Sequence, residues 1–380
     1  MKKRHRRLGL AAVLAGIVTL VLVVSACGGD DDEAAPAPTE PAPAAAAPEP
    51  EPPAPAPAPE PEPPAPAPEP PAPAPEPEPP APAPAEPEVT VAKVAVVAPE
   101  KANDFGWNQQ GVEGATAAAT AMGAEIEVAD EAGFEDITPV LRQLADEDVD
   151  FIVAHASAYN TVAPEVGAEF GIPVVTFDKP DNTTPGLVAD IETSAFQGGY
   201  LAGVLAALTT QTGTLGIVES ADDTNWHKQS GGFIDGARSI NPDIEILLAQ
   251  IAEFGYADTQ GGKRVTDSVI AGGADIVFGM GDGSSFGMLQ SVETSDPPPG
   301  ADQVWFIDVI GDKQGIDEQG VLLSSVLWDF EGTYTQAIAD INAGTFGEQG
   351  YDLNVENGGI ALLRTQFIPD EVWDQVQAAR

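Results

Sequence analysis

Aromatic, carboxylate and amide residues follow most of the apolar runs in this 380-residue sequence, and their chemistry is that of binding. Indole and benzyl rings can stack on the faces of a flat, hydroxylated molecule, while Asp and Asn side chains bind its edges. The candidate ligand-binding residues are Asn103, Asp104, Trp107, His155, Ser157, Tyr159, Asp178, Trp226, Gly281, Asp282, Phe286, Asp308 and Trp328, with Asp222, Asn225, His227 and Ser285 beside them.

Several of these residues also have a purely structural interpretation. Trp107 stands just inside a helix, where core packing is as good an explanation as stacking on a ligand. His155 ends a buried run and, taken by itself, is explained slightly better as a hydrogen-bonded structural histidine. Asp282 and Ser284 are well placed to cap the helix that follows them. Asp308 is the stronger candidate, because a carboxylate at the end of a buried strand is costly without a partner.

The sequence offers little material for catalysis. Gly281-Asp282-Gly283 begins like a dinucleotide fingerprint, but the next glycine is Gly287, so the spacing is broken. There is no GxxxxGK[ST] phosphate loop, and the two histidines after Glu88, His155 and His227, leave little material for a general base. No His or Cys residues pair at metal-ligand spacing. We therefore expect a protein that is not an enzyme and that carries no cofactor and no metal.

Alternating strands and helices position the candidate residues. Strands are predicted at 89–99, 124–129, 149–156, 172–178, 186–191, 214–220, 244–251, 275–281, 303–309 and 321–328. Helices of about 10–15 residues lie between most of them, including helices at 137–146, 162–170, 230–240, 259–271, 285–293 and 333–342. This alternation predicts an α/β fold with parallel sheets.

The pattern forms two series, one before about residue 194 and one after about 212, and so predicts two lobes. Ligands of open α/β sheets bind beyond the carboxyl ends of the strands. The candidate residues occupy those ends, and we expect them to form the walls of a cleft between the lobes.

Charge excludes some partners. After Glu88 the chain has 11 basic and 46 acidic residues, a net charge near −35. Such a field repels nucleic acid and anionic lipid, so nucleic-acid binding is not expected.

The amino-terminal segment has the order of an export signal. Residues 1–7 are strongly basic, and an uncharged apolar run reaches Val24. A membrane-spanning helix is the alternative, since 17 apolar residues lie near the lower length limit. However, Val24-Ser25-Ala26-Cys27 resembles a bacterial lipobox, which implies that 1–26 is removed and that Cys27 carries lipid. Cys27 is the only cysteine, so the protein cannot form an internal disulfide.

Residues 27–88 are expected to tether the folded part. Most of the segment is Ala, Pro and Glu, a composition that forms neither a core nor regular secondary structure. An extended polyproline chain of about 3.1 Å per residue would reach on the order of 150 Å. The segment is either a stalk that lifts the folded part from the membrane or a tolerated insert without a required length.

Beyond these features, the folded part resembles the basic membrane protein family, the nucleoside-binding lipoproteins of ABC transporters. The matching segments cover residues 92–350 and include NDFGWNQQGVEGA, SAFQGGYLAGVLAALTTQTGTLGIV, GGFIDGARSINPDIEI, GGADIVFGMGDGSSFGML and VWFIDVIGDKQ. The resemblance implies the type I periplasmic-binding-protein fold, with two Rossmann-like lobes joined by three crossovers. One lobe would be 89–193 completed by about 329–350, and the other 194–328 completed by about 351–380.

The resemblance also implies roles for particular residues. Asp104 and Asn108 match the family's Asp and Asn, and Trp107 stands where a phenylalanine stacks on the base. Phe286 resembles the opposing ring, and Asp308 resembles the carboxylate that holds the ribose hydroxyls. Trp328 replaces a family lysine near the sugar, and Asn225-Trp226-His227-Lys228 replaces a basic segment. These departures leave a purine or another sugar-bearing molecule as possible ligands.

The sequence thus predicts a lipid-anchored, extracytoplasmic and monomeric protein that binds a nucleoside-like molecule, most simply a purine nucleoside, and delivers it to an ABC permease. Its contact with the membrane would be through the lipid alone. The alternatives are a protein that binds a simple sugar or a sugar-derived signal, and a surface receptor of the same fold without transport.

Overall fold

The computed structural model describes residues 90–380. The expectations for the signal segment, Cys27 and the tether lie outside the described residues. None of the helices within 90–380 has both the length and the apolar character needed to cross a bilayer.

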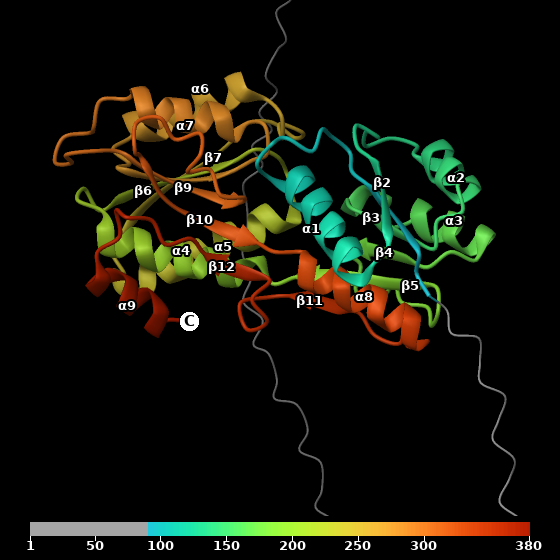
Figure 1. Cartoon of the computed structure of the whole chain (residues 1–380). Coiled ribbons are helices and arrows are strands. Elements are labelled where there is room, and N and C mark those ends of the chain that lie inside the picture. Colours follow the sequence, from blue (N-terminus) through green and yellow to red (C-terminus); the bar gives the residue numbers. More distant parts are fainter. Residues whose placement is uncertain (1–89) are drawn as a thin grey trace, which may run out of the picture. The chain divides into compact units, whose positions relative to one another are not determined.

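The first lobe is built on a six-stranded parallel sheet with the order β11-β5-β4-β3-β1-β2 (Figure 1). Its inner strands are mostly apolar and rich in β-branched residues, as expected for strands that are covered on both faces. The strands are β1 (Lys93–Val97), β2 (Glu125–Ala129), β3 (Phe151–Ala154), β4 (Val174–Phe177), β5 (Val188–Thr193) and β11 (Tyr351–Leu353). The helices of this lobe are α1 (Trp107–Met122), α2 (Thr138–Asp146), α3 (Val162–Phe170) and α8 (Glu331–Ala343), with a 3₁₀ turn η1 (Ser157–Tyr159).

The second lobe repeats this plan with the order β12-β10-β9-β8-β6-β7, in which β12 alone runs antiparallel to its neighbour. The strands are β6 (Thr214–Glu219), β7 (Glu245–Gln250), β8 (Ile276–Met280), β9 (Trp305–Ile310), β10 (Leu322–Trp328) and β12 (Ile360–Leu362). Helices α6 (Thr259–Ala271) and α7 (Ser285–Thr294) lie over one face in Figure 1, and α4 (Ala195–Thr209) and α5 (Thr224–Ile240) over the other. Helix α9 (Asp370–Ala378) packs beside α4.

The chain passes between the sheets three times. The connections run from β5 to α4, from β10 to α8, and from β11 to β12. The predicted α/β class, with two parallel-sheet lobes and three crossovers, is confirmed. The third connection lies slightly later than expected, because residues 351–353 still pair with β5 in the first sheet.

Three elements were not predicted, and one helix begins earlier than expected. The short strands β11 and β12 and the terminal helix α9 follow the last predicted helix. Helix α5 begins at Thr224 rather than near Ser230, because the Asp223 carboxylate accepts the backbone N–H groups of Asn225 and Trp226. This cap moves Trp226 from a loop onto the first turn of a helix.

Candidate functional site

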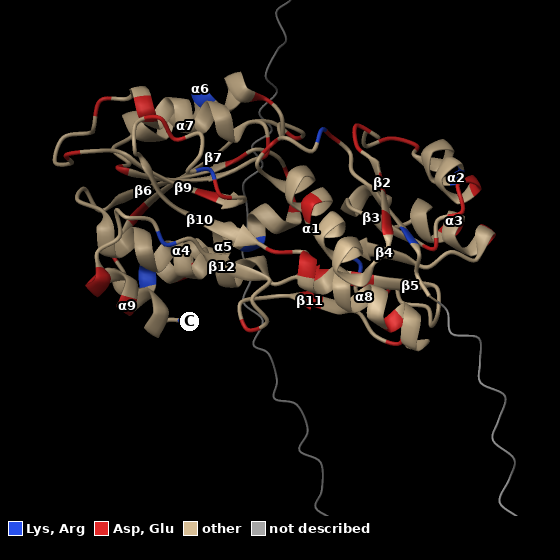
Figure 2. Ribbon diagram, in the orientation of Figure 1, with Lys and Arg blue, Asp and Glu red and all other residues tan. Residues whose placement is uncertain are grey.

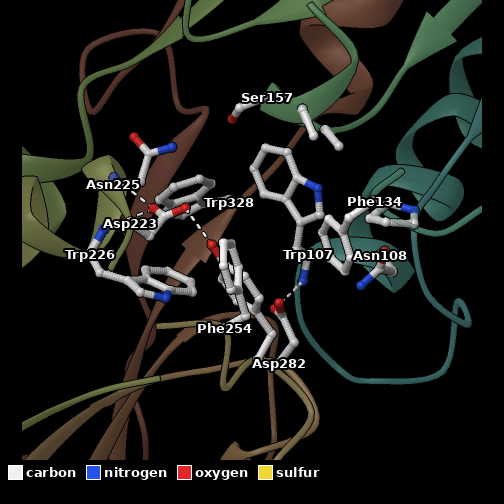
Figure 3. A pocket seen from close by; sticks show the side chains of 14 residues that line it. Trp107, Asn108, Phe134, Ser157, Asp223, Asn225, Trp226, Phe254, Asp282 and Trp328 are labelled. Atoms are coloured by element: carbon white, nitrogen blue, oxygen red, sulfur yellow. Dashed lines mark hydrogen bonds between the residues drawn. The ribbon is translucent and has the colours of Figure 1, made fainter. Parts of the chain in front are cut away.

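A cavity of about 220 Å³ lies between the carboxyl ends of the two sheets (Figure 3). The first lobe contributes Trp107 from the start of α1, Phe134 from the loop after β2, and the segment 156–158 after β3. The second lobe contributes the start of α5, the loop after β7, and groups that end β8 and β10. Besides Trp107, Phe134 and residues 156–158, the cavity is lined by Pro99, Asn108, Asp223, Asn225, Trp226, Phe254, Tyr256, Asp282 and Trp328.

The indole of Trp107 is held rigidly at the cavity wall. Its ring stacks on the His155 imidazole at 4.1 Å, and its Nε1 donates a hydrogen bond of 2.9 Å to the His155 carbonyl. Phe177, Trp328 and Phe330 pack on the same ring at steep angles. A half-buried ring that is fixed in this way loses little side-chain entropy when a flat molecule stacks on it.

His155 supports this ring and does not itself line the cavity. The imidazole is fully buried, with Nδ1 2.7 Å from the Tyr334 hydroxyl and Nε2 2.9 Å from the Trp107 carbonyl. Burial lowers the pKa of His155 to about 3, so the ring is neutral at physiological pH. Its place in the structure matches the structural interpretation of this histidine.

Asp282 connects the lobes at the cavity wall. It is 5% exposed, and its Oδ1 accepts a 3.0 Å hydrogen bond from the backbone N–H of Trp107. Burial, and then the nearby negative charge of Asp104, raise the pKa of Asp282 well above its usual range. The site therefore disfavours additional negative charge.

A second polar bridge between the lobes runs through Asp178. Its Oδ2 accepts from the Ser157 hydroxyl at 2.5 Å and from Asn225 Nδ2 at 3.1 Å, while Oδ1 is buried without a partner. Burial raises the pKa of Asp178 to about 6. Ser157 and Asn225 line the cavity, and Asp178 lies behind them.

The start of α5 brings a carboxylate and an indole to the wall. Asp223 caps the helix and also accepts a 2.9 Å hydrogen bond from the Tyr256 hydroxyl. Trp226 is 3% exposed, and its Nε1 donates to the Ser220 hydroxyl at 3.0 Å. Trp328 closes the wall from β10, and its own buried Nε1 has no hydrogen-bond partner within residues 90–380.

Of the predicted site residues, the structure brings Trp107, Asn108, Ser157, Trp226, Asp282 and Trp328 to the cavity. Others lie outside its lining. Asn103 is exposed in the preceding loop. Asp104 is nearly buried and accepts the backbone N–H groups of Gly106, Asn108 and Gln109, so it fixes the first turn of α1. The fully buried Tyr159 donates from its hydroxyl to the Gly133 carbonyl at 2.5 Å and so holds the loop that carries Phe134.

Phe286 and Asp308 also lie outside the lining, together with Gly281 beside them. Phe105 packs edge-on against Phe286 with 6.1 Å between ring centroids. Asp308 forms a buried ion pair with Lys313 at 3.0 Å, and Lys313 Nζ also donates to the Phe105 carbonyl across the lobes. Contacts within the protein thus occupy Phe286 and Asp308, and the cavity is lined at the second lobe by other rings, among them Trp226.

The sequence reasoning missed Asp223 and the aromatic side chains Phe134, Phe254 and Tyr256. Asp223 precedes α5, and the three aromatic residues lie at corresponding places in the two lobes, in the loops that follow the edge strands β2 and β7. The rings of Phe134 and Tyr256 stack at 5.8 Å across the lobes. The rule that ligands bind beyond the carboxyl ends of strands could have pointed to these aromatic residues, because it applies to edge strands as well as to inner strands.

The arrangement is suited to holding a flat molecule. Rings from both lobes face the cavity, and carboxylate, amide and hydroxyl groups stand between them (Figure 3). No group of three or more His, Cys, Asp or Glu side chains within 90–380 is arranged to hold a metal ion.

Comparison with known proteins agrees with this geometry. The family model described as ABC transporter substrate-binding protein PnrA-like matches residues 91–379. The transcriptional activator protein med of Bacillus subtilis is 26% identical over 288 residues, which are 73% of this chain and 84% of that protein. The ABC transporter nucleoside-binding protein BmpA of Lactococcus lactis is 29% identical over 193 residues, 48% of this chain and 52% of its own length.

A solved ABC transporter solute-binding protein from Conexibacter woesei has the same fold. Its TM-score is 0.61 at 22% identity, over 76% of this chain and 94% of that chain. This likeness confirms the expected type I periplasmic-binding-protein architecture. The family consists of solute-binding proteins and not of enzymes, as expected from the sequence. Since the family model covers nearly the whole described part, this chain belongs to the PnrA-like family of ABC transporter substrate-binding proteins.

Proposed function

We propose that this protein binds a flat, nucleoside-like solute between its lobes, stacked on Trp107 and Trp226, and delivers it to an ABC permease. The observation that carries the proposal is the cavity between the sheets, with an indole from each lobe on its wall. Aromatic rings supply stacking area, and the polar groups between them give orientation. A purine nucleoside has both a flat ring and hydroxyl groups, and the relative BmpA is named as a nucleoside-binding protein.

The route of delivery follows from the amino-terminal sequence. A lipid on Cys27 would hold the protein on the outer face of the membrane, and the 27–88 segment would give the folded part reach. A ligand that contacts both lobes stabilises the closed form by its differential affinity for that form. The permease would then recognise the closed lobes.

Thermal-shift measurements on the full chain in detergent test the ligand class. Adenosine, inosine and guanosine should raise the melting temperature, whereas adenine and D-ribose, which each offer half of the contacts, should raise it less. Calorimetry then gives the affinity. Stabilisation by simple sugars with no response to any nucleoside would reject the proposal in favour of the sugar alternative.

A second candidate is a receptor that binds the same kind of solute without transport. It is favoured by the similarity to a protein named as a transcriptional activator, which extends over 84% of that protein. Uptake of labelled adenosine by cells that have or lack this protein separates the two, because only the transport function predicts loss of uptake.

A further inference from the structure

The cavity wall combines rings with negative charge and has no cationic side chain. Six aromatic residues line it: Trp107, Phe134, Trp226, Phe254, Tyr256 and Trp328. Asp223 and Asp282 are the carboxylates of the wall, and among the described residues no Lys, Arg or His belongs to it. Figure 3 shows both carboxylates pointing into the space between the rings.

The nearest basic groups are already occupied. Lys313 is fully buried, paired with Asp308 and bonded to the carbonyls of Phe105 and Val309. Lys228 forms an ion pair with Glu192. Basic residues are sparse throughout residues 90–380, while acidic residues occur on both lobes (Figure 2). An anionic ligand would therefore find no positive charge at the wall.

Further carboxylates stand directly behind the wall. Asp104 lies close enough to raise the pKa of Asp282, and Glu100 adds to the same effect. Asp178, with one buried and unpartnered oxygen, lies behind Ser157 and Asn225. Carboxyl groups thus gather at low exposure, which disfavours their ionised forms, and a positive charge in the cavity would favour the ionised form of Asp282.

The faces of the aromatic rings also favour a cation in the cavity. The face of an indole, phenol or phenyl ring is the negative part of its quadrupole and attracts a cation within about 6 Å, by roughly 2 kcal/mol when water is excluded. Trp328 belongs to this aromatic wall. It is 2% exposed, lines the cavity, and has an indole N–H without a partner in the described chain.

We propose that the ligand of this cavity is a flat organic cation, a nucleoside-like molecule whose ring carries a positive charge, held between the aromatic walls with Asp223 and Asp282 as counter-charges. This inference rests on the proposed function and adds the charge of the ligand.

Matched ligands test the charge separately from the ring. At pH 6.5, 1-methyladenosine is a cation and adenosine is neutral, and the two differ by one methyl group. Calorimetry on the full chain in detergent should give at least tenfold tighter binding of 1-methyladenosine. Equal or tighter binding of adenosine would overturn the inference about charge and leave the proposed function standing.

A second pair carries the charge without a flat ring. Choline and 3,3-dimethylbutan-1-ol have nearly the same shape, and only choline is charged. Preference for choline, with no binding of either nucleoside, would support the charge and overturn the nucleoside-like function. If no member of either pair binds, the inference about charge falls, and the proposed function falls with it when inosine and guanosine also fail to bind.

Variants locate the counter-charges. Asp282→Asn keeps an acceptor for the Trp107 N–H, and Asp223→Asn keeps an acceptor for the helix cap, so each removes mainly charge. Each should reduce the preference for 1-methyladenosine over adenosine at least threefold. Asp243→Asn removes one charge from the exposed surface of the same lobe and should leave the preference unchanged. A preference that survives both cavity variants in folded protein would place the counter-charge elsewhere and reject the assignment.

Discussion

Trp107 is the residue on which the binding proposal depends most directly. Its ring lines the cavity, and the stack on His155 and the bond to the His155 carbonyl fix its orientation before any ligand arrives. We predict that Trp107→Ala weakens the binding of the nucleoside identified by screening by at least tenfold, about 1.4 kcal/mol. Calorimetry well below the melting temperature measures the effect.

Trp305→Ala is the matched control for loss of an indole. Trp305 is half-buried at the amino end of β9, where it packs on Phe367 and does not reach the cavity. The Trp305→Ala variant should bind the nucleoside with the affinity of the wild type, and the Trp107→Phe variant should retain part of that affinity. Unchanged affinity in Trp107→Ala would remove this residue from the site.

The raised pKa of Asp178 leads us to expect that the free energy of unfolding depends on pH. Burial raises its folded pKa to about 6 from an ordinary value of 3.8, against the opposing effects of the Ser157 hydrogen bond and of Lys228. The folded state therefore binds more protons than the unfolded state between these two values. The contribution of Asp178 to the free energy of unfolding thus falls as pH rises through this window.

Asp178→Asn should remove this fall. Between pH 5 and 7.5 the variant should gain about 1.4 kcal/mol relative to the wild type, because a single site titrating near 6 loses that much over this range. Nearby Asp223 and Glu192 add to the raised pKa, and His155 titrates in the opposite direction. These groups remain in both proteins, so the difference in melting temperature isolates Asp178. Parallel pH curves would contradict the assignment.

At the scale of elements, α4 and α5 approach each other closely in the second lobe. A methyl group at Gly203 would lie 2.0 Å from the Phe233 carbonyl oxygen, and one at Gly236 would lie 2.0 Å from that of Tyr200. Backbone cannot yield as a flexible side chain can. Glycine at these positions thus lets the backbones of the two helices approach, and α5 in turn positions Trp226.

This contact gives a stability prediction with a control on the same helix. Gly236→Ala should destabilise the protein by about 1–3 kcal/mol. Gly231→Ala meets no atom within 4 Å and should stabilise α5 by about 0.5–1 kcal/mol, because alanine loses less backbone entropy in a helix. Denaturant unfolding compares the two. Similar losses in both variants would contradict the close approach of the helices.

The elements show how far the sequence could predict the fold and the site. Apolar β-branched runs and the alternation of strands and helices define both lobes, because these signals are local. Which residues line the cavity depends less on local sequence signals. Phe286 follows β8 at the start of α7 and Asp308 lies within β9, yet Phe105 packs on Phe286 and Lys313 pairs with Asp308, and Lys313 in turn bonds to the distant Phe105 carbonyl. Phe134 and Tyr256 come from loops whose meeting across the lobes depends on how the two sheets face each other.

At the scale of the whole molecule, the lobes are held together by contacts that surround the cavity. Trp107 bonds to Asp282, Asn225 to Asp178, and Lys313 to the Phe105 carbonyl. At the rim, the half-exposed Phe134 stacks on Tyr256. We expect a ligand to leave past this rim, so that the rim contact acts mainly on dissociation.

We therefore predict that Phe134→Ala increases the dissociation rate of the bound nucleoside at least fivefold and changes its association rate by less than twofold. The rim stack resists opening, and its loss lowers the barrier to release by about 1 kcal/mol, the size of one aromatic pair. Stopped-flow fluorescence of the cavity tryptophans follows both rates. Phe170→Ala removes an equally exposed ring from the end of α3, which does not line the cavity, and should leave both rates unchanged. If Phe134→Ala instead slows association and leaves dissociation as in the wild type, the ring guides entry of the ligand, and the other contacts between the lobes alone control its release.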